Sequence, residues 1–318
     1  MVLTAARRVV RSLVVVLLVT LGSVALLSLA PGSAASVILG ENATPQAIAA
    51  LNSQLGLDQP LWQQYLHWLG GAVTGDLGTS PVTHEPVVDA LLQRLPVTLE
   101  LAVMALAISL VTSVVLAIVS ATWQGTWVDR AITAFSSVLL SVPAFIAGPL
   151  LIYFFSLQLG WFPVSGWSRI DTDGLAANLQ SALLPAVAIA FTEIAAFHRV
   201  LRADLISTLR EDFIGAARAK GMSRTYVMVR HALRPSSFSL ITLAGINLGR
   251  LIGGTVVVET LFSLPGLGQL IISSIISRDL IAVQGIVVFV VVVYVVVNML
   301  VDLSYNWLDP RVRKVAAA

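Results

Sequence analysis

Long apolar runs alternate with short polar or charged stretches along most of this sequence. Six of the runs approach or exceed the roughly 20 residues that a helix needs to cross the hydrocarbon core of a bilayer. A helix satisfies its own backbone hydrogen bonds in lipid, and the alternating ten-residue strands of an outer-membrane barrel are not seen here. The pattern therefore predicts six spanning helices, at Val9–Leu29, Val97–Ala121, Ile132–Leu157, Ala182–Val200, Phe238–Val258 and Leu280–Leu303.

The composition agrees with a membrane protein. Of the 318 residues, 57% are hydrophobic and 11% are charged, whereas a soluble domain carries about 25% charged residues. The chain has no cysteine, which excludes disulfides, thiol chemistry and cysteine-ligated metals. The predicted fold class is an all-α polytopic membrane protein with six transmembrane helices.

The first predicted span allows two interpretations. Arg7, Arg8 and Arg11 precede or open the apolar run, and the small residues GSAAS follow it at Gly32–Ser36. This order is also that of a secretory signal peptide. Because the run of about 20 residues exceeds the 7–15 residues usual for a signal core, we favour an uncleaved helix.

Basic residues are distributed unevenly between the two sides of this topology. With a cytoplasmic N-terminus, Arg94, Arg169 and Arg278 lie in outside segments, and Arg250 lies within the fifth span. Lys and Arg accumulate on the cytoplasmic side of membrane proteins, so both termini are predicted to be cytoplasmic. The fifteen basic residues on that side are Arg7, Arg8, Arg11, Arg130, Arg199, Arg202, Arg210, Arg218, Lys220, Arg224, Arg230, Arg234, Arg311, Arg313 and Lys314.

The first outside segment, residues 31–95, is long enough to hold ordered structure. Within it, LWQQYLHWLGG places Trp62, Tyr65, Leu66 and Leu69 at helical spacing on one apolar face. Such a helix lies on the membrane surface or packs against the protein's own spans, and the pattern fits both. The segment is also acidic, with Glu41, Asp58, Asp76, Glu85 and Asp89.

Sequence signatures of catalysis are missing. Neither Lys220 nor Lys314 follows a glycine, so the chain has no phosphate-binding loop ending in GK[ST]. No serine lies in the GxSxG pattern of a nucleophile elbow. We therefore expect no enzyme active site and no metal site. The histidines lack the spacing of metal ligands; they are His67, His84, His198 and His231.

A basic segment follows the fourth predicted span, in the cytoplasmic loop of residues 204–236. Alanines in EDFIGAARAKG favour a short helix, and Gly221 suits the left-handed residue that ends one. Ser223 is placed to cap a second helix, which Pro235 is expected to end before the fifth span. The small residues of the first helix let another surface approach closely. The segment is thus either a peg for a partner or an ordinary basic loop.

The same stretch resembles the cytoplasmic loop of permease subunits in ABC importers, whose pattern is EAA, three residues and then glycine. Gly215, Ala216 and Ala217 align with EAA, and Gly221 aligns with the final glycine. Since Gly215 replaces the glutamate, no carboxylate contact is expected there. The resemblance implies a coupling helix that docks into an ATP-hydrolysing subunit. The coupling residues would be Gly215, Ala216, Ala217, Arg218, Ala219, Lys220 and Gly221.

Further motifs, in order, resemble the dipeptide and oligopeptide permease family, in the branch with a long first outside loop. They are LGLDQPLWQQYLHWL, GDLGTS, RLPVTLELA, WFPVSGW, ARAKGMS, RHALRP, GGTVVVETLFSLPGLGQL, RDLIAVQG and LDPRVR. The resemblance implies the fold of a type I ABC importer permease. The expected division is residues 1–30 (cytoplasmic segment and first span), 31–95 (extracytoplasmic loop with amphipathic helices), 96–305 (five-helix core with the coupling loop 204–236) and 306–318 (cytoplasmic tail).

A member of this family is one subunit of an importer in the bacterial cytoplasmic membrane. The resemblance implies ATP-driven uptake of di- or oligopeptides. The expected partners are a homologous second permease, two ABC ATPase subunits or domains, an external substrate-binding protein and membrane lipid, but no nucleic acid. ATP and Mg²⁺ would be bound by the ATPases, so this chain would hold no cofactor. The alternatives are a permease of the same family for nickel complexes, glutathione or haem, a stand-alone secondary transporter or channel, and a membrane scaffold or sensor.

Charged residues within the predicted spans are candidates for the translocation path. A charge in a bilayer is costly unless it is paired or hydrated, so it faces the protein interior or a cavity. Arg250 lies near the middle of the fifth span, Asn247 shares its face, and Glu193 lies in the fourth span. Arg250 either lines the path, where it attracts a peptide carboxylate or backbone carbonyls, or pairs with Glu193 or across the interface between permeases.

Two further features lie at the outer end of the fifth span. Glu259 is placed to meet a peptide amine or to lie in the interface between permeases. Gly253 and Gly254 permit either a close approach of another helix or a bend.

Overall fold

The computed structural model describes residues 14–22, 25, 34–40, 43–54, 56 and 58–308. The regular elements of these residues are helices; they form no β-strand, and one isolated bridge pairs Thr79 with Pro86. The predicted all-α class is confirmed for this part of the chain. Two compact units share the chain: Met1–Thr98 with Pro265–Val296, and Leu99–Leu264 with Val297–Ala318.

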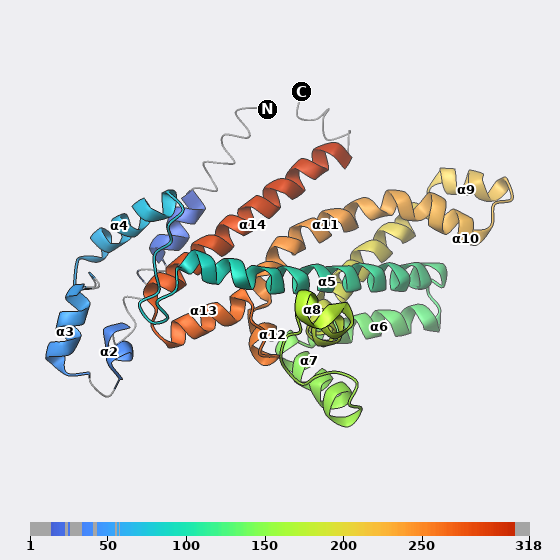
Figure 1. Cartoon of the computed structure of the whole chain (residues 1–318). Helices are drawn as coiled ribbons and strands as arrows, with labels where there is room; N and C mark the ends of the chain where they lie inside the picture. Colours follow the sequence, from blue (N-terminus) through green and yellow to red (C-terminus); the bar gives the residue numbers. More distant parts are fainter. Residues whose placement is uncertain are drawn as a thin grey trace, which may run out of the picture. The chain divides into compact units, whose positions relative to one another are not determined.

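The first unit combines the segments at the two ends of the sequence. Its apolar side chains form one cluster, in which Val87 and Leu91 are buried with Leu267, Ala282 and Ile286. Its helices, labelled in Figure 1, are α2 (Ala34–Leu39), α3 (Pro45–Gln54), α4 (Leu61–Val73), the start of α5 (Val87–Thr122), α13 (Leu267–Ile276) and most of α14 (Leu280–Leu308).

Helices α5 and α14 approach each other closely within this unit. A Cβ atom added to Gly285 of α14 would lie 2.6 Å from Cγ1 of Val87 on α5. No real side chain tolerates that distance, so a glycine is required where the two helices touch.

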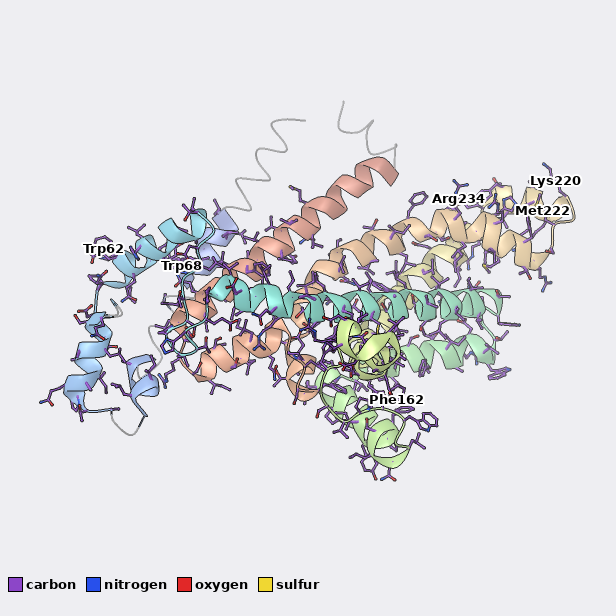
Figure 2. The ribbon with its side chains drawn as sticks, in the orientation of Figure 1. Trp62, Trp68, Phe162, Lys220, Met222 and Arg234 are labelled. Atoms are coloured by element: carbon purple, nitrogen blue, oxygen red, sulfur yellow. The ribbon has the colours of Figure 1, made fainter. Side chains whose placement is uncertain are left out.

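The predicted amphipathic helix exists as α4, and its aromatic residues divide between two environments. The Tyr65 hydroxyl is 2.8 Å from Oγ1 of Thr20, and Trp68 donates to the Leu77 carbonyl at 3.1 Å. By contrast, Trp62 and Leu66 are 61% and 57% exposed; Figure 2 labels both tryptophans. One side of α4 therefore packs on the chain while the other presents apolar side chains outward.

The second unit is built around α8. Ala182, Ala186 and Ala190 of this helix recur every four residues and are fully buried, which lets neighbouring helices approach closely. Helices α6, α7 and α11 pack against α8. After α5, the elements are α6 (Trp127–Ser141), α7 (Ala144–Leu151), the π-helical segment η2 (Ile152–Gln158), α8 (Ile170–Thr208), α9 (Asp212–Ala219), α10 (Arg224–Tyr226), the π-helical segment η3 (Val227–Ala232), α11 (Leu233–Gly254) and α12 (Val256–Leu261).

Three helices among the described residues are long and apolar enough to cross a membrane. They are Val87–Thr122, Ile170–Thr208 and Leu280–Met299. They overlap the second, fourth and sixth predicted spans. A fourth candidate is the pair Trp127–Ser141 and Ala144–Gln158, which is bent by 102°. The bend lies at Val142 and Pro143, where Val142 has extended backbone, because proline disfavours a helical conformation of the residue before it.

The remaining two predicted spans are less simple. Only residues 14–22 and 25 of the first span lie within the described part of the chain, and they are helical. The fifth span is divided, because α11 ends at Gly254 and α12 begins at Val256. The count of six spans stays a prediction.

Candidate functional site

The segment expected to couple to an ATPase forms a short helix and a turn directly after α8. Helix α9 has Asp212 in its first turn and Arg218 in its last, an arrangement that the helix dipole favours. Gly221 follows with a φ of +78°, the left-handed conformation that glycine adopts at little cost. Ser223 then accepts a hydrogen bond from the Tyr226 N–H at 3.3 Å. We call residues 212–226 the elbow.

Pro235 does not end the helix that follows the elbow, so that prediction was wrong. Helical structure continues from α10 through η3 into α11. A proline ring normally clashes with the carbonyl four residues earlier, which here belongs to His231. The segment before the proline, η3, is π-helical and not α-helical, and the helix continues through Pro235.

One side of α9 packs on the protein and the other is open. Ile214 and Ala217 are 0% and 6% exposed and belong to an apolar cluster with Leu205, Val227 and Met228. A Cβ atom at Gly215 would meet no atom within 4 Å. Lys220 lies near the tip of the elbow (Figure 2). Of the seven predicted coupling residues, Ala217 faces the core, and the exposed ones are Gly215, Ala216, Arg218, Ala219, Lys220 and Gly221.

A partly buried ion pair lies close to the base of the elbow. Arg202 of α8 donates from Nε and Nη2 to the two carboxylate oxygens of Asp129 at 2.8 and 2.7 Å. Ser120 also donates to this carboxylate, as does the Gly125 N–H at 2.9 Å. The network joins α5, α6 and α8. Sequence reasoning missed it, and an acidic residue in the first turn of α6 was the one available signal.

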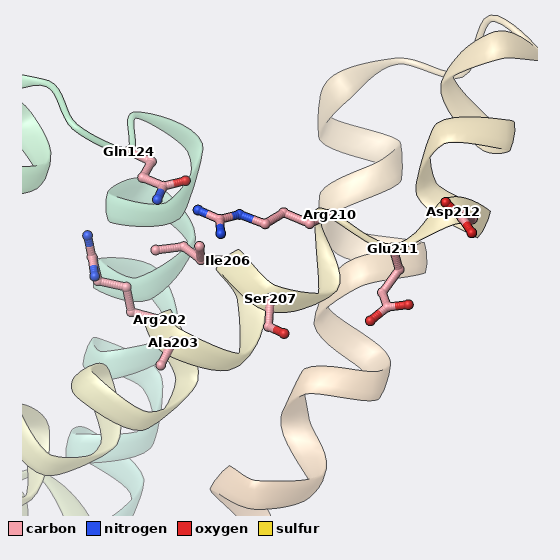
Figure 3. A pocket seen from close by; sticks show the side chains of 8 residues that line it. All are labelled: Gln124, Arg202, Ala203, Ile206, Ser207, Arg210, Glu211 and Asp212. Carbon is pink, nitrogen blue, oxygen red and sulfur yellow. The ribbon is translucent and has the colours of Figure 1, made fainter.

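A cleft of about 590 Å³ opens beside this network. Figure 3 shows the Arg210 side chain extending toward Gln124, while Glu211 and Asp212 lie where α8 passes into α9. The cleft carries both basic and acidic groups next to the elbow. Its lining residues are Gln124, Arg202, Ala203, Ile206, Ser207, Arg210, Glu211 and Asp212.

Three of the four predicted path residues form one polar group between α8 and α11. Glu193 accepts a hydrogen bond from Nδ2 of Asn247 at 2.7 Å, and it pairs with Nη2 of Arg250. The Glu193 side chain is 4% exposed, whereas the Arg250 side chain is 60% exposed. The pairing considered from the sequence is therefore present, and it leaves most of the guanidinium accessible.

The fourth predicted path residue, Glu259, lies beside the break between α11 and α12. It is fully buried, and it accepts a hydrogen bond from Thr255 Oγ1 at 2.7 Å. A Cβ atom at Gly253 or Gly254 would meet no atom within 4 Å. Of the two roles considered for this glycine pair, the structure shows an interrupted helix, not a close helix contact.

Comparison with known families accounts for almost the whole chain. Residues 113–314 match the family described as "Binding-protein-dependent transport system inner membrane component". Residues 1–102 match the N-terminal part of the same kind of membrane component. The chain belongs to this family of permeases. The family predicted from the order of the motifs is thereby confirmed.

Several relatives of the permease match along nearly their full length. A probable peptide ABC transporter permease protein of Sinorhizobium fredii is 38% identical over 307 residues, 96% of this chain and 98% of the relative. A putative peptide transport system permease protein of Brucella abortus is 37% identical over the same shares. A glutathione transport system permease protein of Escherichia coli K12 is 35% identical over 283 residues, 89% of this chain and 90% of the relative.

A solved structure supports the fold of the permease. The crystal structure of an amino acid ABC transporter with histidines aligns with a TM-score of 0.52 and 18% sequence identity. The alignment covers 69% of this chain and 94% of that chain. The helical permease fold is therefore shared, although the sequences have diverged widely.

Proposed function

We propose that this permease is one subunit of an ATP-driven importer that takes up di- or oligopeptides. An external substrate-binding protein delivers the peptide, and a homologous second permease completes the translocation path. The observation that carries this proposal is the similarity, over 96% of the chain, to proteins named as peptide permeases. The chain itself is not catalytic, because ATP and Mg²⁺ are bound by two partner ATPase subunits or domains.

The elbow is the part of the chain that we assign to the ATPase. The side of α9 turned away from the core exposes Gly215, Ala216 and Ala219, which allow close approach of a partner backbone. Arg218 and Lys220 add charged donors beside them. Ile214 and Ala217 fix the helix to the core of the second unit, so that a movement of the docked ATPase is passed to the spanning helices.

The proposed topology has six spans in the bacterial cytoplasmic membrane and both termini in the cytoplasm. The chain contains no cysteine, so single cysteines are clean reporters of sidedness. A cysteine at Thr172, in an outside segment of the proposed topology, should react with an impermeant maleimide in intact spheroplasts. A cysteine at Ser223 should react only after the membrane is opened. The reverse result would invert the topology.

The path is assigned to the polar group of Glu193, Asn247 and Arg250, together with Glu259. The exposed guanidinium of Arg250 supports this assignment, since a charge facing lipid would be costly. Access would alternate between the two sides of the membrane as the ATPases close and open. ATP shifts this equilibrium only through a difference in its binding free energy between the two states.

Co-purification tests the function as a whole. The tagged chain is expressed with the proteins encoded beside it, extracted in mild detergent, and examined for its partners and for ATP hydrolysis. We expect a second permease, the ATPases and hydrolysis that the loaded binding protein stimulates. A self-associated protein whose uptake does not depend on an ATPase would instead indicate a secondary transporter or channel.

Glutathione is a second candidate substrate, because one relative named for glutathione transport is 35% identical over 89% of this chain. The purified binding protein of the same system separates the two candidates. Calorimetric titration with glutathione and with di- and oligopeptides should show which ligand binds more tightly, and uptake into proteoliposomes should follow the same order.

A further inference from the structure

The Arg250 guanidinium is held at one nitrogen. Its Nη2 pairs with Glu193, whose other oxygen accepts from Asn247 Nδ2 at 2.7 Å. Glu193 is the one hydrogen-bond partner that the described residues give to Arg250. A guanidinium carries five N–H donors in a planar fork, so most of its donors are left for another group. The structure thus presents a cation that is paired at one nitrogen and exposed elsewhere.

Arg250 lies beside open space and close to a break in its helix. Along the helix, exposed positions one turn away include Gly253 and Gly254, beside which space is open. The helix is then interrupted at Thr255. In transport proteins, interrupted spanning helices border substrate sites near the middle of the membrane.

The exposed surface of helix α14 is apolar and provides a comparison for α11. Its exposed residues include Val292, Val296 and Met299. None of these side chains bears a charge, in contrast to the exposed Arg250 of α11. On α11 the exposed residue one turn before Arg250 is Ile246, so Arg250 is the charged group on this side of the helix. An exposed guanidinium within a span is suited to a water-filled path, where it stays hydrated.

We propose that Arg250 binds the C-terminal carboxylate of the transported peptide, and that Glu193 and Asn247 are positioning residues that orient its guanidinium. This inference rests on the proposed function as a peptide importer. The planar fork of arginine matches a carboxylate in a two-point contact. Every peptide with a free C-terminus has that group whatever its sequence, so one such contact serves many peptides.

The pairing with Glu193 also explains how the peptide leaves. A guanidinium without a neighbouring carboxylate would carry its full charge toward the peptide and would hold the peptide carboxylate more tightly. Glu193 offsets part of its charge, and a transport site has to bind weakly enough to release. Removing this carboxylate should therefore strengthen the hold on the peptide or misorient the fork.

The test compares peptides with free and amidated C-termini in proteoliposomes that contain the whole complex and saturating loaded binding protein. For each peptide, ATP-dependent uptake is measured with the wild type and with Arg250→Gln. The double ratio is the ratio of free-peptide to amidated-peptide uptake in the wild type, divided by the same ratio in Arg250→Gln. Because the same binding protein delivers both peptides to each complex, its own preference for one peptide cancels in this double ratio. We expect Arg250→Gln to reduce uptake of the free peptide by about 10- to 100-fold relative to the amide, the loss expected for one charged hydrogen-bonding contact.

Three matched variants sharpen the result. Arg250→Lys keeps the charge but not the fork and should retain part of the discrimination. Glu193→Gln and Asn247→Ala should change the ratio between the peptides without abolishing assembly. Arg230→Gln, an exposed arginine outside this group, should leave the ratio at the wild-type value.

Other outcomes would overturn the proposal. A double ratio near one in an intact Arg250→Gln complex would remove the carboxylate contact, even if uptake fell. Loss of the second permease from the Arg250→Gln complex would assign Arg250 to the interface between permeases. Absence of ATP-dependent peptide uptake by the wild type would refute the proposed importer, which is a separate failure.

Discussion

Ser80 donates a hydrogen bond to the buried carboxylate of Asp279, although the two residues are 199 positions apart in the sequence. The Ser80 hydroxyl in turn accepts from the Thr83 N–H at 2.9 Å, and the other oxygen of Asp279 accepts from the Ala282 N–H at 2.9 Å, at the start of α14. The motifs GDLGTS and RDLIAVQG therefore form a single structural element. It fixes the loop of residues 74–86 to the first turn of α14.

Asp279→Ala should destabilise the first unit by about 1–3 kcal/mol. The substitution leaves the buried Ser80 hydroxyl without its acceptor, and it removes the side-chain cap of α14. Each loss lowers the free energy of unfolding by up to about 3 kcal/mol. Thermal unfolding of the purified permease in detergent measures the change. Ser277→Ala is the control, because its hydroxyl bonds backbone carbonyls of its own segment. Equal melting temperatures for wild type and Asp279→Ala would contradict the prediction.

Gly285→Ala should destabilise the contact between α5 and α14 by about 1–3 kcal/mol, the usual cost of overpacking. The added methyl would lie 2.6 Å from Cγ1 of Val87. The double variant Gly285→Ala with Val87→Ala removes the clashing atom and should recover part of the loss. At Gly70 in α4, an added Cβ atom would meet no atom within 4 Å. Gly70→Ala is therefore the control and should be neutral or slightly stabilising. Failure of Val87→Ala to recover any stability would show that this clash is not the cause.

Local signals in the sequence predicted local structure well. Gly221 and Ser223 act where their backbone and capping preferences place them, and apolar runs of sufficient length became long helices. The sequence did not decide whether the helix breaks near Thr255, because Gly253 and Gly254 allow either a bend or a close contact with another helix. The prediction for Pro235 failed because the helix continues through it after a π-helical segment, which no residue pattern indicates.

Hydrogen bonds and ion pairs between residues far apart in the sequence could not be predicted. Asp129 and Arg202 are 73 positions apart, and Ser80 and Asp279 are farther still. Periodicity reports which face of a helix is buried, but it carries no information about which polar group lies opposite. Glu193 and Arg250 were an exception, because charges inside spans are so few that few pairings exist.

Asp129→Ala should destabilise the second unit by about 3 kcal/mol, because it leaves the partly buried Arg202 charge without its partner. The charge-reversed pair, Asp129→Arg with Arg202→Asp, should not restore stability. Ser120 and the Gly125 N–H both donate to the carboxylate at position 129, and an arginine there accepts from neither. Melting temperatures of the three proteins test this. Full recovery by the reversed pair would mean that charge alone, not the donor geometry, holds the network.

Ala216→Trp should separate the permease from its ATPase without unfolding it. Ala216 is exposed on α9, so a large side chain there meets solvent in the free chain but blocks close approach of a partner. We expect at least a 10-fold loss of ATPase in pull-downs and a matching loss of uptake, at an unchanged melting temperature of the isolated permease.

Ala217→Trp is the matched contrast, because the two alanines are adjacent but Ala216 is exposed and Ala217 is buried. Ala217 is 6% exposed and packs with Ile214 in the apolar cluster, so the same substitution should cost about 1–3 kcal/mol of permease stability by overpacking. A side chain that blocks docking and one that damages the core both abolish uptake, and the melting temperature distinguishes them. An Ala216→Trp permease that still retains the ATPase and transports normally would show that this side of α9 is not the docking surface, and the elbow would then be an ordinary basic loop.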